Sequence, residues 1–295
     1  MHYRPRTAVV TSLEYDHADI FSSIEAVEAA FRGLVGLVPG GGHLVVWHGA
    51  DRARRLIAAH ARSARVTVYA TESRADAHLF AAQNTSGPRG LTLELVERAT
   101  ALGRVEVPLW GEINAQHVLA AVAVARELGL DSDEIRAGLA SFRGVRRRLE
   151  VRGEPRGVTV VDDFAHHPTA VSKTLEAARQ RWPSRRVWAL FEPRSATSRR
   201  NVFQREYVAA LSGADQVVIG SHERLDEIPV EARFDAALLA RELLAHQVPA
   251  WAESNVDSIV ARLVEETRAG DVVLIFSNGS FGGLHGKLLA RLEGE

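Results

Sequence analysis

Short apolar runs alternate with amphipathic helical patterns along almost the whole chain. The runs RVWALF (186–191) and DVVLIF (271–276) have the length and composition of buried strands, and each is followed by polar residues and then by a helical pattern. Strands that alternate with helices are typical of βαβ units, which build parallel sheets covered by helices. We therefore expect an α/β fold with mostly parallel sheets.

A charged, glycine-containing stretch, RGVRRRLEVRGEPRG (143–157), interrupts this alternation near the middle of the chain. A length of 295 residues is enough for two ordinary domains, and this stretch is the best boundary between them. We predict one domain at 1–148 and a second at 149–295. In the first, residues 91–109 alternate apolar and polar, which predicts an antiparallel hairpin.

Local signals place some helix starts. Ser22 with Glu25, and Asp131 with Glu134, have the spacing of a capping box. Pro168 is expected in the first turn of a helix, because its fixed φ suits that position.

The bulk composition excludes several function classes. The formal net charge is −1, so no global field attracts nucleic acid or an anionic membrane. No apolar run approaches the ~18 residues of a membrane span. Cysteine is absent, which excludes disulfides, thiol nucleophiles and cysteine-ligated metal sites. We expect no nucleic-acid or membrane partner, and a cytoplasmic location.

Unusual polar residues concentrate directly after the predicted strands. In open parallel sheets, ligands bind outside the carboxyl ends of the strands. This coincidence predicts an anionic ligand at a sheet edge. The segments are EYDHAD (14–19), DDFAHHP (162–168), EPRSATSRR (192–200), GSHER (220–224) and SNGSFGG (277–283).

Taken singly, these segments leave alternatives open. EYDHAD has the donors to hold a divalent metal beside a phosphate, but its spacing alone favours a polar loop. The arginines at 146–148 and 194 suit phosphate or carboxylate recognition, or are solvated surface residues. DDFAHHP is a metal site, an acid/base pair or the edge of a nucleotide pocket.

Six stretches, in this order, resemble the Mur ligase family, the ATP-dependent amide ligases of peptidoglycan synthesis. Within the family they are most similar to the branch that recycles murein tripeptides. The stretches are SLEYDHADIF (12–21), GEINAQHVLAAVAVA (111–125), FRGVRRRLE (142–150), VVDDFAHHPTAV (160–171), EPRSATS (192–198) and SNGSFGGLHGKLL (277–289).

The resemblance implies a remnant of the central ATP-binding domain at 1–148, followed by a Rossmann-like C-terminal domain at 149–295. It implies ATP and Mg²⁺ as cofactors, with UDP-N-acetylmuramate and L-alanyl-γ-D-glutamyl-meso-diaminopimelate as substrates. The reaction would pass through an acyl phosphate and would depend mostly on positioning and on neutralising phosphate charge.

The resemblance also implies roles for single residues, carried over by motif. In the first domain, the residues near the metal are His17 and Asp16, His17 being catalytic as well, and those near adenine are Asn114 and His117. Arg148 reaches the ATP phosphates as a catalytic and nucleotide-binding residue. In the second domain, Asp163 and His166 face the nucleotide, and Arg194 and Ser195 read the peptide.

Several family features are missing from the sequence. The 295 residues contain no P-loop of the form G-T-[KN]-G-K-T and no UDP-sugar-binding domain ahead of it. His117 replaces the family's second asparagine, and Ile113 replaces a histidine. We expect a truncated or split ligase that needs a separate N-terminal fragment, and whose first sheet has an open, partly apolar edge. The alternatives are a non-catalytic nucleotide- or peptide-binding protein derived from a Mur ligase, and an unrelated α/β nucleotide-binding enzyme.

Overall fold

The computed structural model describes residues 3–221 and 228–294, and its contacts divide the chain into two compact units. Unit 1 is Met1–Arg143 and unit 2 is Gly144–Glu295. The domain boundary expected between residues 148 and 149 stays a prediction. Among the described residues, no helix is long and apolar enough to cross a membrane. The GSHER segment lies partly outside the described residues.

Unit 1 contains a six-stranded sheet in which chain order and spatial order are the same. The first four strands are parallel, and the last two pair antiparallel, which confirms the hairpin predicted at 91–109. The strands are β1 (Thr7–Val10), β2 (His43–Trp47), β3 (Arg65–Ala70), β4 (Leu79–Gly87), β5 (Gly90–Glu97) and β6 (Thr100–Val107).

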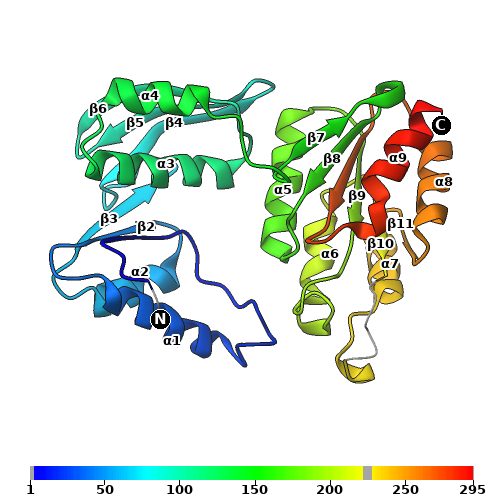
Figure 1. Cartoon of the computed structure of the whole chain (residues 1–295), viewed down its shortest axis with the longest axis horizontal. Helices are drawn as coiled ribbons and strands as arrows, with labels where there is room; N and C mark the ends of the chain where they lie inside the picture. Colours follow the sequence, from blue (N-terminus) through cyan, green and yellow to red (C-terminus); the bar gives the residue numbers. More distant parts are fainter. Residues whose placement is uncertain (1–2, 222–227, 295) are drawn as a thin grey trace. The chain divides into compact units, whose positions relative to one another are not determined.

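Helices cover both faces of this sheet (Figure 1). Because side chains alternate along β2, Leu44 and Val46 pack with α1 (Ile24–Leu37) and α2 (Asp51–His60). Val45 points to the other face, where it packs with α3 (Glu112–Glu127) and α4 (Ser132–Ser141). Unit 1 is therefore a three-layer α/β structure.

Within the described residues, β1 lies at the edge of the first sheet and pairs only with β2. Val9 of this strand is 39% exposed, whereas Ala8 and Val10 on its other face are buried. An edge strand is therefore present, as expected from the sequence, although only one side chain of β1 makes it apolar.

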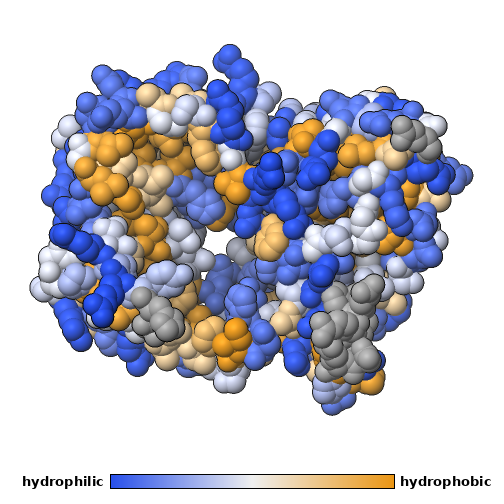
Figure 2. All heavy atoms as spheres, viewed as in Figure 1, coloured by the Kyte–Doolittle hydropathy of each residue, from blue (hydrophilic) through white to orange (hydrophobic). Residues whose placement is uncertain are grey.

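The space-filling view shows hydrophobic residues gathered over the region of α3 and α4, surrounded by hydrophilic side chains (Figure 2).

Unit 2 contains a second six-stranded sheet, ordered β11-β10-β9-β12-β8-β7, in which only β7 is antiparallel. The two sheets confirm the α/β, mostly parallel prediction. The strands are β7 (Glu150–Gly153), β8 (Thr159–Asp163), β9 (Val187–Phe191), β10 (Gln216–Gly220), β11 (Ala250–Glu253) and β12 (Val272–Phe276).

The second sheet also has helices on both faces. Trp188 and Leu190 of β9 pack with α8 and α9, whereas Phe191 points the other way and contacts Tyr207 of α6, with ring centroids 4.6 Å apart. The helices are α5 (Pro168–Arg181), α6 (Glu206–Leu211), α7 (Ala236–Ala245), α8 (Val256–Glu266) and α9 (Leu284–Glu293), with 3₁₀ turns at Pro155–Gly157, Asn201–Phe203, Val230–Ala232 and Phe281–Gly283.

The strand order of unit 2 reverses between β9 and β12. The helix after β9 lies on one face and the helix after β12 on the other, so the loops after these neighbouring strands diverge. Such a switch point leaves a crevice at the carboxyl ends of the strands, where α/β proteins bind ligands. The loops that begin at Glu192 and Ser277 border it.

The structure differs from the sequence-based expectations at two points. β4 and β7 were not predicted. The capping box predicted at Ser22 was wrong, because α1 begins one residue later with Ser23 as its N-cap. Glu25 is then the second helical residue, one position too early for a reciprocal bond. The Asp131 capping box is confirmed with both bonds, and Pro168 begins α5 as expected.

Candidate functional site

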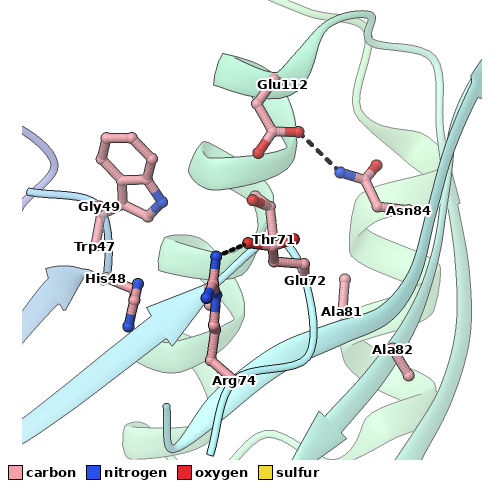
Figure 3. Close-up of a pocket in the computed structure, with 11 residues that line it drawn as sticks. Trp47, His48, Gly49, Thr71, Glu72, Arg74, Ala81, Ala82, Asn84 and Glu112 are labelled. Atoms are coloured by element: carbon pink, nitrogen blue, oxygen red, sulfur yellow. Dashed lines mark hydrogen bonds and ion pairs between the residues drawn. The ribbon is translucent and has the colours of Figure 1, made fainter. Parts of the chain in front are cut away.

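The carboxyl ends of β2 and β3 and the middle of β4 in unit 1 line a pocket of about 590 Å³. Since β6 runs parallel to these strands, α3, which follows it, begins at the same edge. Figure 3 shows Trp47 and His48 on one side of the pocket and Glu112, from the first turn of α3, on the other. This is where an open α/β sheet is expected to bind a ligand.

Polar side chains of this pocket are held by specific partners. Asn84 Nδ2 donates to Glu112 Oε2 at 2.9 Å, and Arg74 pairs with Glu72 (Figure 3). His48 Nε2 lies 2.9 Å from Asp76 Oδ1, outside the pocket. The pocket therefore combines an indole wall with amide, carboxylate and guanidinium groups, a set that suits a flat ring carrying hydrogen-bonding atoms.

Asp16 and His17 lie in the loop after β1, at the same edge of the sheet. His17 has a left-handed backbone (φ 55°), and its N–H donates to Asp16 Oδ1 at 2.7 Å. The N–H groups of Ile20 and Phe21 donate to the His17 carbonyl, at 2.8 and 2.9 Å. Non-glycine residues rarely adopt the left-handed backbone conformation, so it marks a turn whose geometry the surrounding structure fixes.

The described residues contain no group of three or more His, Cys, Asp or Glu side chains placed to hold a metal ion. Mg²⁺ commonly takes one or two protein carboxylates and completes its shell with phosphate oxygens and water. Asp16 fits such a partial site. His17 fits less well, because Mg²⁺ prefers oxygen ligands.

Asn114 and His117 lie in the first turns of α3. Asn114 Nδ2 donates to the Trp110 carbonyl at 2.7 Å, and the His117 side chain is exposed. Neither residue lines the 590 Å³ pocket, whereas Glu112 of the same helix does. Glu112 is a pocket residue that the sequence did not single out, and the nucleotide roles of Asn114 and His117 stay predictions.

In unit 2, the segment around Arg148 is fastened to the carboxyl edge of the sheet. Arg147 donates from Nη2 to the carbonyls of Ser277 (2.6 Å) and Gly279 (2.8 Å), and its own carbonyl accepts from Phe164 N at 2.9 Å. Arg148 is exposed, with its guanidinium 5.4 Å from the centroid of the Phe164 ring. A cation over an aromatic face at this distance is favourable and limits where the side chain goes.

Asp163, expected to face a nucleotide, is 3% exposed and uses its carboxylate inside unit 2. Oδ2 accepts from Leu149 N at 2.7 Å and Oδ1 accepts from Ala165 N at 2.8 Å. Burial raises the pKa of Asp163, against the opposing effect of these two backbone hydrogen bonds and of Arg148. Its observed task is to hold Leu149, and with it Arg148, against the loop after β8.

The neighbouring Asp162 points to the other face and forms an ionic cluster. Its carboxylate lies 3.3 Å from both Arg147 Nε and His285 Nε2. Burial by itself raises the pKa of Asp162, but hydrogen bonding and charge from His285 and Arg147 outweigh it and hold the pKa below its usual range. Sequence reasoning missed this cluster because its members are up to 138 positions apart in the chain, from Arg147 to His285.

The two adjacent histidines have local structural tasks. His167 is the N-cap of α5 and its Nδ1 accepts from Thr169 N at 3.3 Å, while its ring packs edge-on against Phe203. His166 Nδ1 lies 3.0 Å from the Phe164 carbonyl. Both rings therefore help to fix the loop between β8 and α5.

Arg194 and Ser195 lie in the loop after β9, beside the switch point. Arg194 is exposed and packs so closely on Gly279 that a Cβ atom at position 279 would overlap its guanidinium. Ser195 Oγ accepts from Ser198 N at 3.0 Å and so caps the turn that follows. Beneath them, Ser277 Oγ donates to the buried carboxylate of Glu192. Three arginines, Arg147, Arg148 and Arg194, thus lie at the carboxyl edge of the sheet of unit 2.

Two family profiles match successive parts of the chain. Residues 1–125 match the profile described as "Mur ligase middle domain", and residues 147–279 match "Mur ligase, glutamate ligase domain". The chain belongs to the Mur ligase family. The fold is that of these two Mur ligase domains, which confirms the resemblance and the fold read from the six motifs.

Named relatives agree with this assignment. The chain is 35% identical over 299 residues to the Escherichia coli UDP-N-acetylmuramate–L-alanyl-γ-D-glutamyl-meso-2,6-diaminoheptandioate ligase, covering 99% of this chain and 60% of the relative. It is 34% identical over 278 residues to the Salinibacter ruber UDP-N-acetylmuramate–L-alanine ligase, covering 93% and 57%.

The crystal structure of a murein peptide ligase from Psychrobacter arcticus superimposes with a TM-score of 0.72 at 26% identity, covering 100% of this chain and 59% of that one. The chain thus spans about 60% of the length of the curated relatives it matches.

Proposed function

We propose that these 295 residues take part in the ATP-dependent joining of UDP-N-acetylmuramate to L-alanyl-γ-D-glutamyl-meso-diaminopimelate. The observation that carries the proposal is the 35% identity, over 99% of the chain, to an E. coli ligase whose name states that reaction. In this reaction the lactyl carboxylate is phosphorylated at the expense of ATP. The peptide amine then attacks the carbonyl carbon, the C–O bond to phosphate breaks, and phosphate and a proton leave.

The residues of this chain would bind and orient the reactants. In unit 1 we assign Asn114, His117 and the pocket beside Glu112 to the nucleotide, and Asp16 with His17 to the surroundings of Mg²⁺. The cation supplies charge neutralisation to the phosphates when it is bound. A partial site fits an ion whose remaining ligands are phosphate oxygens and water.

In unit 2 we assign Arg148, Asp163 and His166 to the nucleotide side of the reaction. Arg148 supplies an exposed guanidinium, and such a group is suited to the charge that develops on a transferring phosphoryl group. Asp163 would act indirectly, because its carboxylate is engaged by the N–H of Leu149 beside Arg148. Arg194 and Ser195 are assigned to the peptide.

The peptide assignment rests on charge as well as on motif. The tripeptide has three carboxylates, whereas L-alanine, the acceptor of the other relatives, has one. The exposed Arg194 beside the switch point offers a guanidinium fork for a carboxylate. An arginine-rich edge therefore favours the more anionic acceptor.

Acceptor choice is the first test of this assignment. In a protein that joins this chain to a P-loop-bearing Mur ligase segment, we expect kcat/KM for the tripeptide to exceed that for L-alanine by at least about tenfold. Arg194→Gln should raise KM for the tripeptide more than for L-alanine, with Arg205→Gln as a charge-matched control on another exposed arginine of unit 2. Equal use of both acceptors would contradict the assignment to the tripeptide branch.

A second candidate function follows from a feature of the sequence itself. The 295 residues contain no P-loop, whose backbone amides and lysine cradle nucleotide phosphates in this family. A protein that retains peptide or nucleotide binding without catalysis is the alternative. It predicts saturable binding of tripeptide or nucleotide but no ligation, whether or not a P-loop-bearing segment is supplied.

A further inference from the structure

A second pocket of unit 1, of about 290 Å³, lies at the opposite edge of the sheet from the candidate site. Its lining includes His43 and Arg65, which begin β2 and β3, and Arg126 and Glu127 from the last turn of α3. The other pocket touches the first turn of the same helix. A 16-residue helix is about 24 Å long, so the two pockets are separate.

His43 is the most informative residue of this second pocket. It is 2% exposed, and its Nε2 lies 2.8 Å from Thr67 Oγ1. Its buried Nδ1 has no hydrogen-bond partner among the described residues, and the nearest carboxylate oxygen, on Glu127, is 3.8 Å away. A buried polar atom without a partner is costly, so its presence in a pocket lining points to a ligand atom as the missing partner.

Each of the two histidines in the lining keeps one ring N–H as a hydrogen-bond donor. Burial, together with the charge of Arg65, lowers the pKa of His43, which keeps the ring neutral at neutral pH. When the Thr67 hydroxyl donates to Nε2, the proton of His43 is on Nδ1. In His78, Nδ1 accepts from Val68 N at 3.0 Å, so the ring proton is on Nε2. Each ring then has one N–H left for a ligand, which reaches that of His43 only after neighbouring side chains move, because Nδ1 is buried.

One guanidinium of the lining has no ion-pair partner among the described residues. Arg65 pairs with Glu127, and Arg126 Nε lies 3.1 Å from Glu97 Oε2. Arg98, in the turn between β5 and β6, takes part in no ion pair within the described part of the chain. Its backbone N–H donates to the His78 carbonyl at 2.9 Å, which fixes the turn beside the pocket. The lining contains three arginines and two glutamates, so these residues alone give it a formal charge of +1.

We propose that this second pocket binds a small phosphate-bearing anion, held by the Arg98 guanidinium and by ring N–H groups of His43 and His78. Charge-assisted hydrogen bonds to phosphate oxygens are strong, and a phosphate group supplies an acceptor for each of these donors at once. The site does not depend on the ligase reaction, because it lies at the amino ends of the strands and none of its residues belongs to the candidate site.

Inorganic phosphate, titrated into the 295-residue chain at constant ionic strength, tests the proposal. Nitrogen-15 NMR of the imidazole rings should show a saturable change at His43 and His78. The rings of His17, His48 and His117, at the other edge of unit 1, should not change with the same phosphate midpoint as His43 and His78. Absence of saturable change at His43 and His78, or change confined to other histidines, would overturn the site.

Arg98→Gln removes the unpaired charge from an exposed turn and should weaken phosphate binding about tenfold or more, the effect of losing one charge-assisted hydrogen bond. Arg89→Gln is the matched control, because Arg89 is an exposed arginine in the turn between β4 and β5, at the opposite end of β5 from Arg98. Equal phosphate affinity in Arg98→Gln, Arg89→Gln and the parent would refute the proposal.

Discussion

Replacing Asp271 with alanine is expected to lower the free energy of unfolding of unit 2 by about 2–4 kcal/mol, because a buried carboxylate that pairs with the partly exposed Arg186 and accepts two further hydrogen bonds is removed. Asp271 is 4% exposed. Its Oδ2 accepts from Arg186 Nη2 at 2.6 Å, from Trp188 Nε1 at 3.0 Å and from Arg268 N at 3.0 Å. The alanine variant leaves the buried indole N–H and a guanidinium without their acceptor.

The pH dependence of this contribution has a definite sign. Burial by itself raises the pKa of Asp271, but the hydrogen bonds from Arg186, Arg268 and Trp188 outweigh it and hold the pKa below its usual range. The stabilisation is therefore fully present above the pKa of the unfolded chain and is lost as the pH falls through the lower, folded-state pKa. The alanine variant should lose this part of the acid dependence.

Urea unfolding followed by amide hydrogen exchange in β9 and β12 measures the effect within unit 2. Asp257→Ala is the control, because Asp257 is 75% exposed and pairs with Lys287 at the surface. An exposed pair of this kind contributes under about 1 kcal/mol. Similar losses in the two variants would contradict the assigned role of Asp271.

Replacing Asp163 with alanine is the second large effect, an expected loss of about 2–4 kcal/mol in the stability of unit 2. Two buried N–H groups, those of Leu149 and Ala165, lose their acceptor, at about 1–3 kcal/mol each. Part of this loss is offset, because burial makes the ionised carboxylate itself unfavourable. Asparagine should rescue only in part, since its single carbonyl oxygen can serve one of the two N–H groups well.

Asp163 also has a pH signature opposite to that of Asp271. Burial raises its pKa in the folded state, so the ionised form destabilises unit 2 as the pH rises through the folded-state pKa. The contribution of Asp163 to the stability of unit 2 becomes more favourable as the pH falls toward the pKa of the unfolded chain. Amide exchange at Leu149 is the direct readout. If that amide remains protected in Asp163→Ala, the carboxylate does not fasten the segment that carries Arg148.

The sequence predicted the elements that are almost completely buried and whose pattern is contained in one short segment. β12 is a continuous apolar run buried at every position, and α3 has a long apolar face, so both were predictable from pattern alone. β4 was not, because only its first four residues, Leu79 to Ala82, are apolar and the rest of the strand is polar or glycine. That strand exists because β5 pairs along its length, a tertiary effect that local propensity does not contain.

Some loops of the candidate site were predictable, but the loops after β2 and β3, which line the 590 Å³ pocket, were not selected, and no contacts were predicted. The rule that ligands bind at the carboxyl ends of strands selected the loops after β1, β8, β9 and β12, and each of them lies at that edge. Side-chain direction was not accessible. Asp162 and Asp163 are adjacent and chemically identical, yet the pleat of β8 sends one to an ionic cluster and the other to backbone N–H groups.

ATP-dependent joining of UDP-N-acetylmuramate to the tripeptide is the most direct measurement of the proposed function. It should be assayed with the 295-residue chain alone and with the same chain fused to a P-loop-bearing segment of the E. coli tripeptide ligase. The proposal predicts product from the fusion and none from the chain alone, because the 295 residues lack the phosphate-cradling loop. Robust product from the chain alone, or a folded fusion that binds tripeptide and forms no product, would contradict it.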